Sequence, residues 1–184
     1  LAEHVASIAG VLESHAHHED AVIDPVLERH LPQLAHEINA DHERLEAMFA
    51  SITDLAGAAI DAADHDERRL LQLLHLDLAS FTSSYLDHID LEERAVMQRL
   101  PQLIGVDEIA AMHGAIVSSI PPEEMAQSLS FMLPAMNLDD RADLFMGMRT
   151  AAPREAFDAT VGLARSVLRP ADFAALADKI GVAR

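Results

Sequence analysis

The chain of 184 residues contains no cysteine and no tryptophan, and only 4% of its residues are aromatic. Without cysteine, disulfides, thiolate nucleophiles, iron–sulfur clusters and cysteine-ligated zinc sites are excluded. The low aromatic content, set beside abundant alanine and leucine, favours helices over sheets. We therefore predict an all-α protein, and a chain of this length forms one domain, or one domain with an appendage.

Long apolar runs are also missing from the sequence. No stretch reaches the roughly 18 consecutive apolar residues that a membrane-spanning helix requires. The first residues lack the basic segment and the apolar run of a secretory signal. We therefore expect a cytoplasmic protein that has no membrane partner.

Basic residues are few. The chain has 13 Lys and Arg against 31 Asp and Glu, a formal net charge of −18. This charge argues against nucleic acid or anionic lipid as a partner, because both select basic patches. Residues 1–119 hold 22 of the acidic residues, 6 of the basic residues and all 11 histidines. This distribution favours a metal-binding domain over residues 1–119 and a metal-free helical extension over residues 120–184.

Apolar residues recur at helical spacing through the first domain. They predict four helices, over about residues 2–31, 33–61, 64–100 and 107–119. Prolines and a glycine separate these segments, and Pro121-Pro122 marks the boundary between the two domains. Beyond that boundary, helix start signals near residues 122, 137, 153 and 170 predict further helices.

Two stretches of the first domain repeat one ligand pattern. In the first stretch, His15-x3-Glu19 is followed after 22 intervening residues by His42. In the second, His88-x3-Glu92 is followed after 20 residues by His113. Chance alone gives roughly 0.8 His-x3-Glu pairs in a chain of this composition, so the inference depends on the repeat rather than on one pair.

The spacing within each pair explains how it binds metal. Residues four apart share one face of a helix, so an imidazole and a carboxylate can bind one cation or two adjacent ones. This mixed ligand set suits iron, and helix bundles build such sites from inward-facing side chains. Glu19 and Glu92 would bridge two metals, and the histidines would be the terminal ligands of each metal. The predicted metal ligands are His15, Glu19, His42, His88, Glu92 and His113.

The motifs around these residues resemble those of the hemerythrin-like (HHE cation-binding) family. The resemblance covers roughly residues 10–115, and the segment after it is similar to the C-terminal extension of some bacterial members. The motifs that carry it are His15-x3-Glu19-Asp20 near Pro25, Asp41-His42, and Tyr85-x2-His88-x3-Glu92-Glu93. The resemblance implies an up-down four-helix bundle with a non-haem, carboxylate-bridged di-iron centre that binds dioxygen or other small molecules. Within it, His15, Glu19, His42, His88 and Glu92 match ligand positions of the family.

The chain departs from the family pattern in two places. The histidine of the family's first helix has no clear counterpart before His15. The internal repeat suggests that His113 takes this ligand place, and a segment upstream of Leu1 is the alternative source. Classical oxygen carriers also have a second histidine four residues after the one matched by His42. Glu46 stands there instead, which argues against ordinary reversible oxygen carriage.

The leading functional interpretation is a di-iron protein that binds O2, NO or peroxide at an iron with an open position. Three alternatives stay open at this point. The first is an enzyme of the same fold that decomposes peroxide or oxidises NO, and the second is an iron- or oxygen-sensing or iron-storage module. The third is a helical interaction domain in which the histidines are incidental. The sequence also leaves open a homo-oligomer formed through the C-terminal helices.

Overall fold

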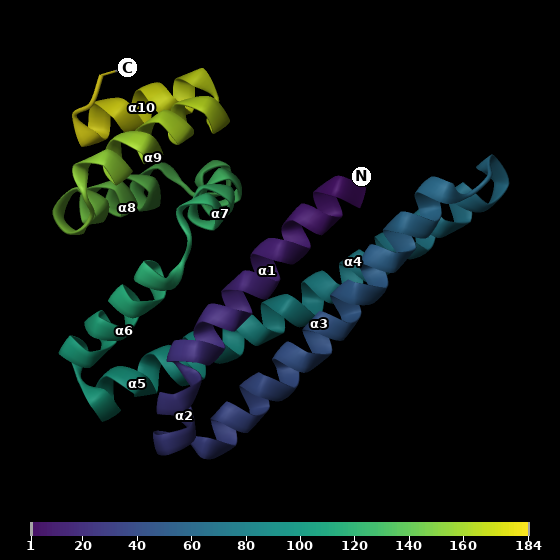
Figure 1. Cartoon of the computed structure of the whole chain (residues 1–184), viewed down its shortest axis with the longest axis horizontal. Coiled ribbons are helices and arrows are strands. Elements are labelled where there is room, and N and C mark those ends of the chain that lie inside the picture. The colour runs from purple at the N-terminus through teal and green to yellow at the C-terminus, as the bar shows by residue number, and fades with distance from the viewer. Residues whose placement is uncertain (1, 184) are drawn as a thin grey trace. The chain divides into compact units, whose positions relative to one another are not determined.

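The structure is a computed structural model that describes residues 2–183, with the backbone alone for residues 2, 64 and 65. Within this range the chain is all-helical and contains no strand, so the predicted all-α class is confirmed (Figure 1). No helix of the described range combines the length and the apolarity needed to cross a membrane. The chain divides into two compact units, Leu1–Ile120 and Pro121–Arg184.

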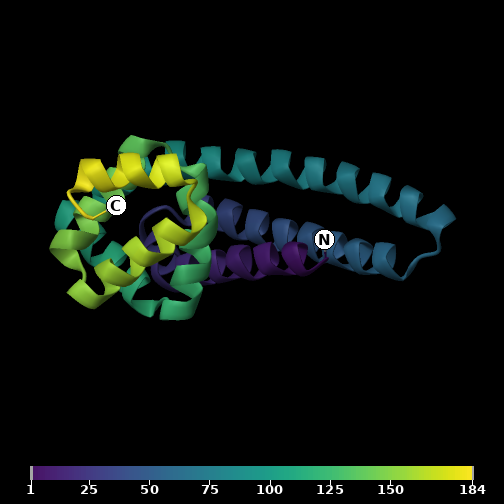
Figure 2. The same ribbon diagram turned by 90° about the horizontal axis from the view of Figure 1, so that it is seen from above.

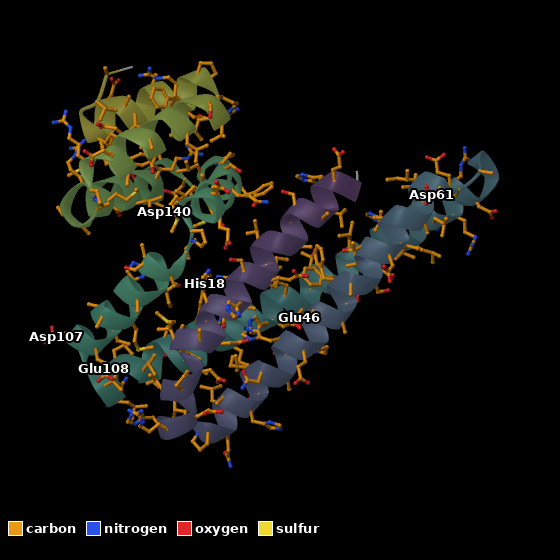
Figure 3. The ribbon with its side chains drawn as sticks, viewed as in Figure 1. His18, Glu46, Asp61, Asp107, Glu108 and Asp140 are labelled. Carbon is orange, nitrogen blue, oxygen red and sulfur yellow. The ribbon has the colours of Figure 1, made fainter. Side chains whose placement is uncertain are left out.

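Three long helices form the first unit. They are α1 (Ala2–Val22), α3 (Pro32–Asp61) and α4 (Asp64–Leu91), and they lie side by side in both views (Figures 1 and 2). The short helix α2 (Asp24–His30) joins α1 to α3. At the other end, the α3–α4 hairpin, where Asp61 is labelled, extends past the start of α1 (Figure 3).

The chain continues from α4 through a π-helical turn, η1 (Glu92–Val96), into α5 (Met97–Ile104) and α6 (Val106–Ser119). Helix α6 packs against α1, where the side chains of Ser119 and His18 form a hydrogen bond of 2.8 Å. The sequence does not predict the π-helical turn. Such turns are rare and occur often at functional sites.

Two helix ends differ from the prediction. The predicted helix 2–31 is two helices, because the chain turns at Ile23 and Pro25 then occupies the first turn of α2, where a proline loses no intrahelical bond. The third predicted helix does not end at residue 100 but continues past Pro101 to Ile104. It ends at Gly105, which has a φ of +83°. Glycine adopts this backbone conformation readily, whereas other residues would be strained in it.

Two apolar clusters fill the first unit. One cluster includes Leu45 and Phe49 of α3 with Phe81 of α4, and the other includes Ile38 of α3 with Val96 of η1. The segments between the clusters carry His42 on α3 and His88 with Glu92 at the junction of α4 and η1. Potential metal ligands therefore occupy a layer with packed hydrocarbon on both sides, and such a layer lowers the local dielectric constant.

The second unit has its own core and no histidine. Its helices begin 16 residues apart, at α7 (Pro122–Ala135), α8 (Leu138–Ala151), α9 (Arg154–Val167) and α10 (Pro170–Ile180). The start signals seen in the sequence are confirmed, and the clearest is Asn137, whose side chain accepts hydrogen bonds from two backbone N–H groups of α8. The side chains of Leu133, Phe145 and Leu176 are fully buried at its centre.

Candidate metal centre

Two histidines from neighbouring helices meet at the centre of the first unit. His42 of α3 and His88 of α4 are 8% and 3% exposed, and their ring centroids lie 4.8 Å apart in an edge-on arrangement. Glu92 lies one turn after His88 and completes a group whose ligand atoms all lie within 4.8 Å of one another. Two imidazoles and one carboxylate at this separation could hold a metal ion, and these ligand types serve both zinc and non-haem iron.

Helix α1 supplies a second His–Glu pair to the same region. His15 Nε2 lies 3.4 Å from Glu19 Oε1, and His88 Nε2 lies 3.3 Å from Glu92 Oε1, so the two pairs have nearly the same geometry. Each pair is four residues apart on one helical face, as the sequence predicted. Five of the six predicted ligands thus line the same two neighbouring cavities.

The carboxyl group of Glu19 is the most perturbed group of the site. Burial and the nearby charge of Glu92 raise the pKa of Glu19 to about 8. Burial lowers the pKa of His15. Burial also acts to lower the pKa of His88, but the hydrogen bond and charge of Glu92 outweigh it and the pKa is raised. In the metal-free protein, protons on Glu19 and His88 therefore stabilise a donor set that a bound cation would otherwise stabilise.

Three buried polar atoms at the site and in the cavity beside it have no hydrogen-bond partner among the described residues. They are Glu19 Oε2, His88 Nδ1 and Asp24 Oδ1. Leaving a buried polar atom unsatisfied costs about 1–3 kcal/mol, so such atoms in a folded protein call for an explanation. A cation bound by Glu19 would satisfy its free oxygen, and the donor set around that oxygen is of the kind that holds iron. On this test the residues fit a metal.

Two further carboxylates lie beside the histidines, and the sequence pattern does not indicate a role for either. The Nδ1–H of His42 donates to Asp20 Oδ1 at 2.8 Å. Asp41 Oδ2 lies 3.8 Å from His88 Nδ1, too far for a hydrogen bond, while its other oxygen accepts from Arg44 at 2.7 Å. The available signal was adjacency, because each of these acids is next in sequence to a predicted ligand. Adjacency does not indicate which histidine each acid reaches.

A small apolar cavity adjoins the histidines. Its volume is about 50 Å³, and besides His15, His42 and His88 its lining includes Leu12, Leu45, Phe49, Phe81 and Tyr85. The Tyr85 ring stacks on Phe81 with centroids 5.8 Å apart and lies 6.3 Å from the His88 ring. Burial and the charges of Glu19 and Glu92 raise the pKa of the Tyr85 hydroxyl, which therefore stays protonated.

A larger cavity lies beside the carboxylates. Its volume is about 230 Å³, and its acidic lining residues are Glu19, Asp20, Asp24, Glu92 and Glu93. Asp24 accepts a hydrogen bond of 3.0 Å from Asn39 through one oxygen. The two cavities differ in volume and in the number of acidic side chains that line them, which is greater in the larger one.

The sixth predicted ligand is placed elsewhere. His113 is exposed on α6 and lines neither cavity. After Gly105 the chain runs back along α1, and the contact of α6 there involves Ser119 and His18. Glu46, one turn beyond His42 on α3 and labelled in Figure 3, is exposed but lines the apolar cavity.

The pKa of Glu19 gives a pH-dependent stability of the metal-free protein. A carboxyl group whose pKa is raised from 4.5 to about 8 stabilises the fold most below pH 4.5, and this contribution is lost as the pH rises through about 8. The raised pKa of His88 acts in the same direction, while the lowered pKa of His15 opposes both. Each pKa unit corresponds to about 1.4 kcal/mol, so we expect a decline of a few kcal/mol at most.

Urea denaturation of the metal-free protein between pH 5 and 8.5 measures this decline. The Glu19→Gln variant is the control, because glutamine cannot ionise. The difference in unfolding free energy between the variant and the wild type should grow with pH in favour of the variant. A difference in unfolding free energy that stays constant from pH 5 to 8.5 would contradict the raised pKa of Glu19.

Comparison with protein-family models, with curated proteins and with solved structures gives no match for this chain. The donor set, its burial and the two cavities are what bear on the function.

Proposed function

We propose that this protein binds a dinuclear non-haem iron centre in the first unit, and that the centre takes a small ligand such as O2, NO or peroxide. One observation carries the proposal. The group formed by the buried His42 and His88 and the half-buried Glu92 faces a second His–Glu pair in which a buried oxygen of Glu19 has no partner among the described residues.

The two metal positions in this proposal have different donor sets. His42, His88 and Glu92 hold the first ion, and His15 with Glu19 provides the second position. The charge of Glu92 raises the pKa of Glu19, and these two carboxylates are the candidates to bridge the ions. When bound, iron supplies the redox chemistry and the affinity for the small ligand.

The residues around the donors shape the ligand site. A cavity of about 50 Å³ exceeds the roughly 10–15 Å³ of such space that one water molecule needs, which suits a diatomic molecule or peroxide. Phe49, Phe81 and Leu45 make most of that cavity apolar. The protonated hydroxyl of Tyr85 is available there to donate a hydrogen bond to a bound ligand.

The hemerythrin-like, up-down four-helix bundle belongs to the same proposal. Helices α1, α3 and α4 are three of its members, and each carries donors. Helix α6, which packs against α1, is the candidate for the fourth place. In this arrangement His113 is not a ligand, because its side chain lines neither of the cavities around the other donors.

Metal analysis of the aerobically purified protein, combined with its absorption spectrum, tests the proposal. Two irons per chain and the near-ultraviolet charge-transfer bands of a bridged ferric pair are the expected result. A single zinc per chain, or protein that takes up no iron when Fe(II) is supplied, would overturn it.

Replacement of His113 tests a residue that the proposed ligand set leaves out. Because His113 is exposed and lines neither cavity, His113→Ala should keep the iron content and the absorption spectrum of the wild type. The thermal midpoint should change little, since an exposed side chain contributes little to stability. Loss of one iron per chain in this variant would restore His113 to the ligand set and refute the one proposed above.

A further inference from the structure

The hydrogen bond between α1 and α3 at the metal centre joins Asp20 to His42. The His42 ring is 8% exposed, and its Nδ1 lies 2.8 Å from Asp20 Oδ1. A carboxylate can only accept a hydrogen bond, so the proton on this bond belongs to Nδ1 of the imidazole. In the neutral ring, Nε2 then carries the free lone pair.

We infer that Asp20 is a positioning residue for metal binding: it fixes the tautomer and the ring orientation of His42, so that Nε2 is the metal-binding nitrogen. This inference rests on the proposed function. Carboxylates that hold the second nitrogen of a metal-ligating histidine act in this way and raise the basicity of the ligand. Asp20 is on α1 and His42 is on α3, so the orientation of the His42 ring also depends on the position of α1.

The other buried histidine lacks such a partner. His88 Nδ1 has no hydrogen bond, and the nearest oxygen of Asp41 is 3.8 Å away. The orientation of His88 depends instead on Glu92, which is itself a proposed ligand. Of the two buried histidines, therefore, His42 is the one that a group outside the ligand set orients, and removing that group should affect metal binding without removing a donor.

A purely structural role for Asp20 makes different predictions. The Asn39–Asp24 hydrogen bond lies near the same helix interface and links α2 to α3 without touching a histidine. Asn39→Ala removes that bond and retains every carboxylate and imidazole. It therefore reports what the loss of an interhelical hydrogen bond does to metal binding when no ligand is reoriented.

The charge of Asp20 is the second effect to separate. Asp20 lines the larger, acidic cavity. Its negative charge attracts cations whether or not its side chain also orients His42. Asp20→Asn removes the charge but keeps a side-chain carbonyl that accepts from Nδ1–H. Asp20→Ala removes both, so the pair of variants separates orientation from charge.

The experiment measures Fe(II) affinity of the full chain under anaerobic conditions by competition with a chromophoric chelator. We expect Asp20→Ala to bind Fe(II) about 10- to 100-fold more weakly than wild type, the range found when such outer-shell partners are removed. Asp20→Asn should stay within a few-fold of wild type. Asn39→Ala should bind Fe(II) as wild type does, even if its thermal midpoint falls.

A second measurement does not need metal. Nitrogen-15 spectra of the metal-free protein should show His42 as the Nδ1–H tautomer in wild type and Asp20→Asn, and as a mixture in Asp20→Ala. Wild-type affinity in Asp20→Ala, or equal losses in Asp20→Ala and Asp20→Asn, would overturn the inference. Failure of the wild type to bind Fe(II) would instead refute the proposed function, and the tautomer measurement would still test the role of Asp20 on the ring.

Discussion

Replacement of His88 by alanine is expected to remove at least one iron and to lower the thermal midpoint of the first unit. His88 is the most buried donor of the site, at 3% exposure, and belongs to the group with His42 and Glu92. Without it, this position keeps two donors and gains a cavity. Iron content should fall from two ions per chain to one or none, because a position with two remaining donors holds its ion weakly.

The stability loss has two sources that can be measured separately. A metal bound only by the folded chain stabilises it by about 2.7 kcal/mol when present at 100 times its dissociation constant. This part is lost only in the presence of iron. Removing the buried ring also costs the metal-free protein a few kcal/mol through the cavity and the unpaired Glu92. Thermal denaturation with and without iron distinguishes the two contributions.

His75→Ala is the matched control for this variant. His75 is an exposed histidine on the same helix, 13 residues before His88, and it lines neither cavity. We expect this variant to keep both irons and the wild-type melting curve. Wild-type iron content in His88→Ala would remove α4 from the metal centre and with it the proposed function.

Replacement of Glu19 by glutamine is expected to remove the second iron and keep the first. The second position has only His15 as a terminal donor and depends on the bridging carboxylates for the rest, and the amide of glutamine is a weak ligand for iron. The first group contains no residue of α1, so it should retain one ion per chain. The charge-transfer bands of the bridged pair should disappear while a mononuclear Fe(II) site persists.

Metal analysis and the absorption spectrum of Glu19→Gln measure this outcome directly. The substitution keeps the size of the side chain, and the pKa of about 8 means that the wild-type carboxyl is largely protonated at neutral pH in the metal-free protein. The fold of the metal-free variant should therefore remain intact at pH 7. Two irons per chain in Glu19→Gln would show that Glu19 is not a ligand, whereas the loss of both ions would show that the first group does not hold metal alone.

Much of the fold was predictable from sequence because helices form through local interactions. The spacing of apolar residues and the positions of Pro32, Asn137 and Pro170 determine where helices begin, and hydrogen bonds within each helix require no distant partner. The pairs His15/Glu19 and His88/Glu92 followed from the same local geometry, since residues four apart share a face. The sequence alone therefore determined the all-α class and placed each His–Glu pair on one helical face.

Which helical faces meet was decided only by the tertiary structure. The distance of 2.8 Å between Asp20 and His42 joins residues 22 positions apart, and it depends on how α1 packs against α3. The repeat in the sequence assigned His113 the same part as His42, but the turn at Gly105 returns α6 along α1 and leaves that side chain exposed. Spacing along a chain determines the face that a residue occupies on its own helix, whereas its partners on other helices depend on turns and packing between distant segments.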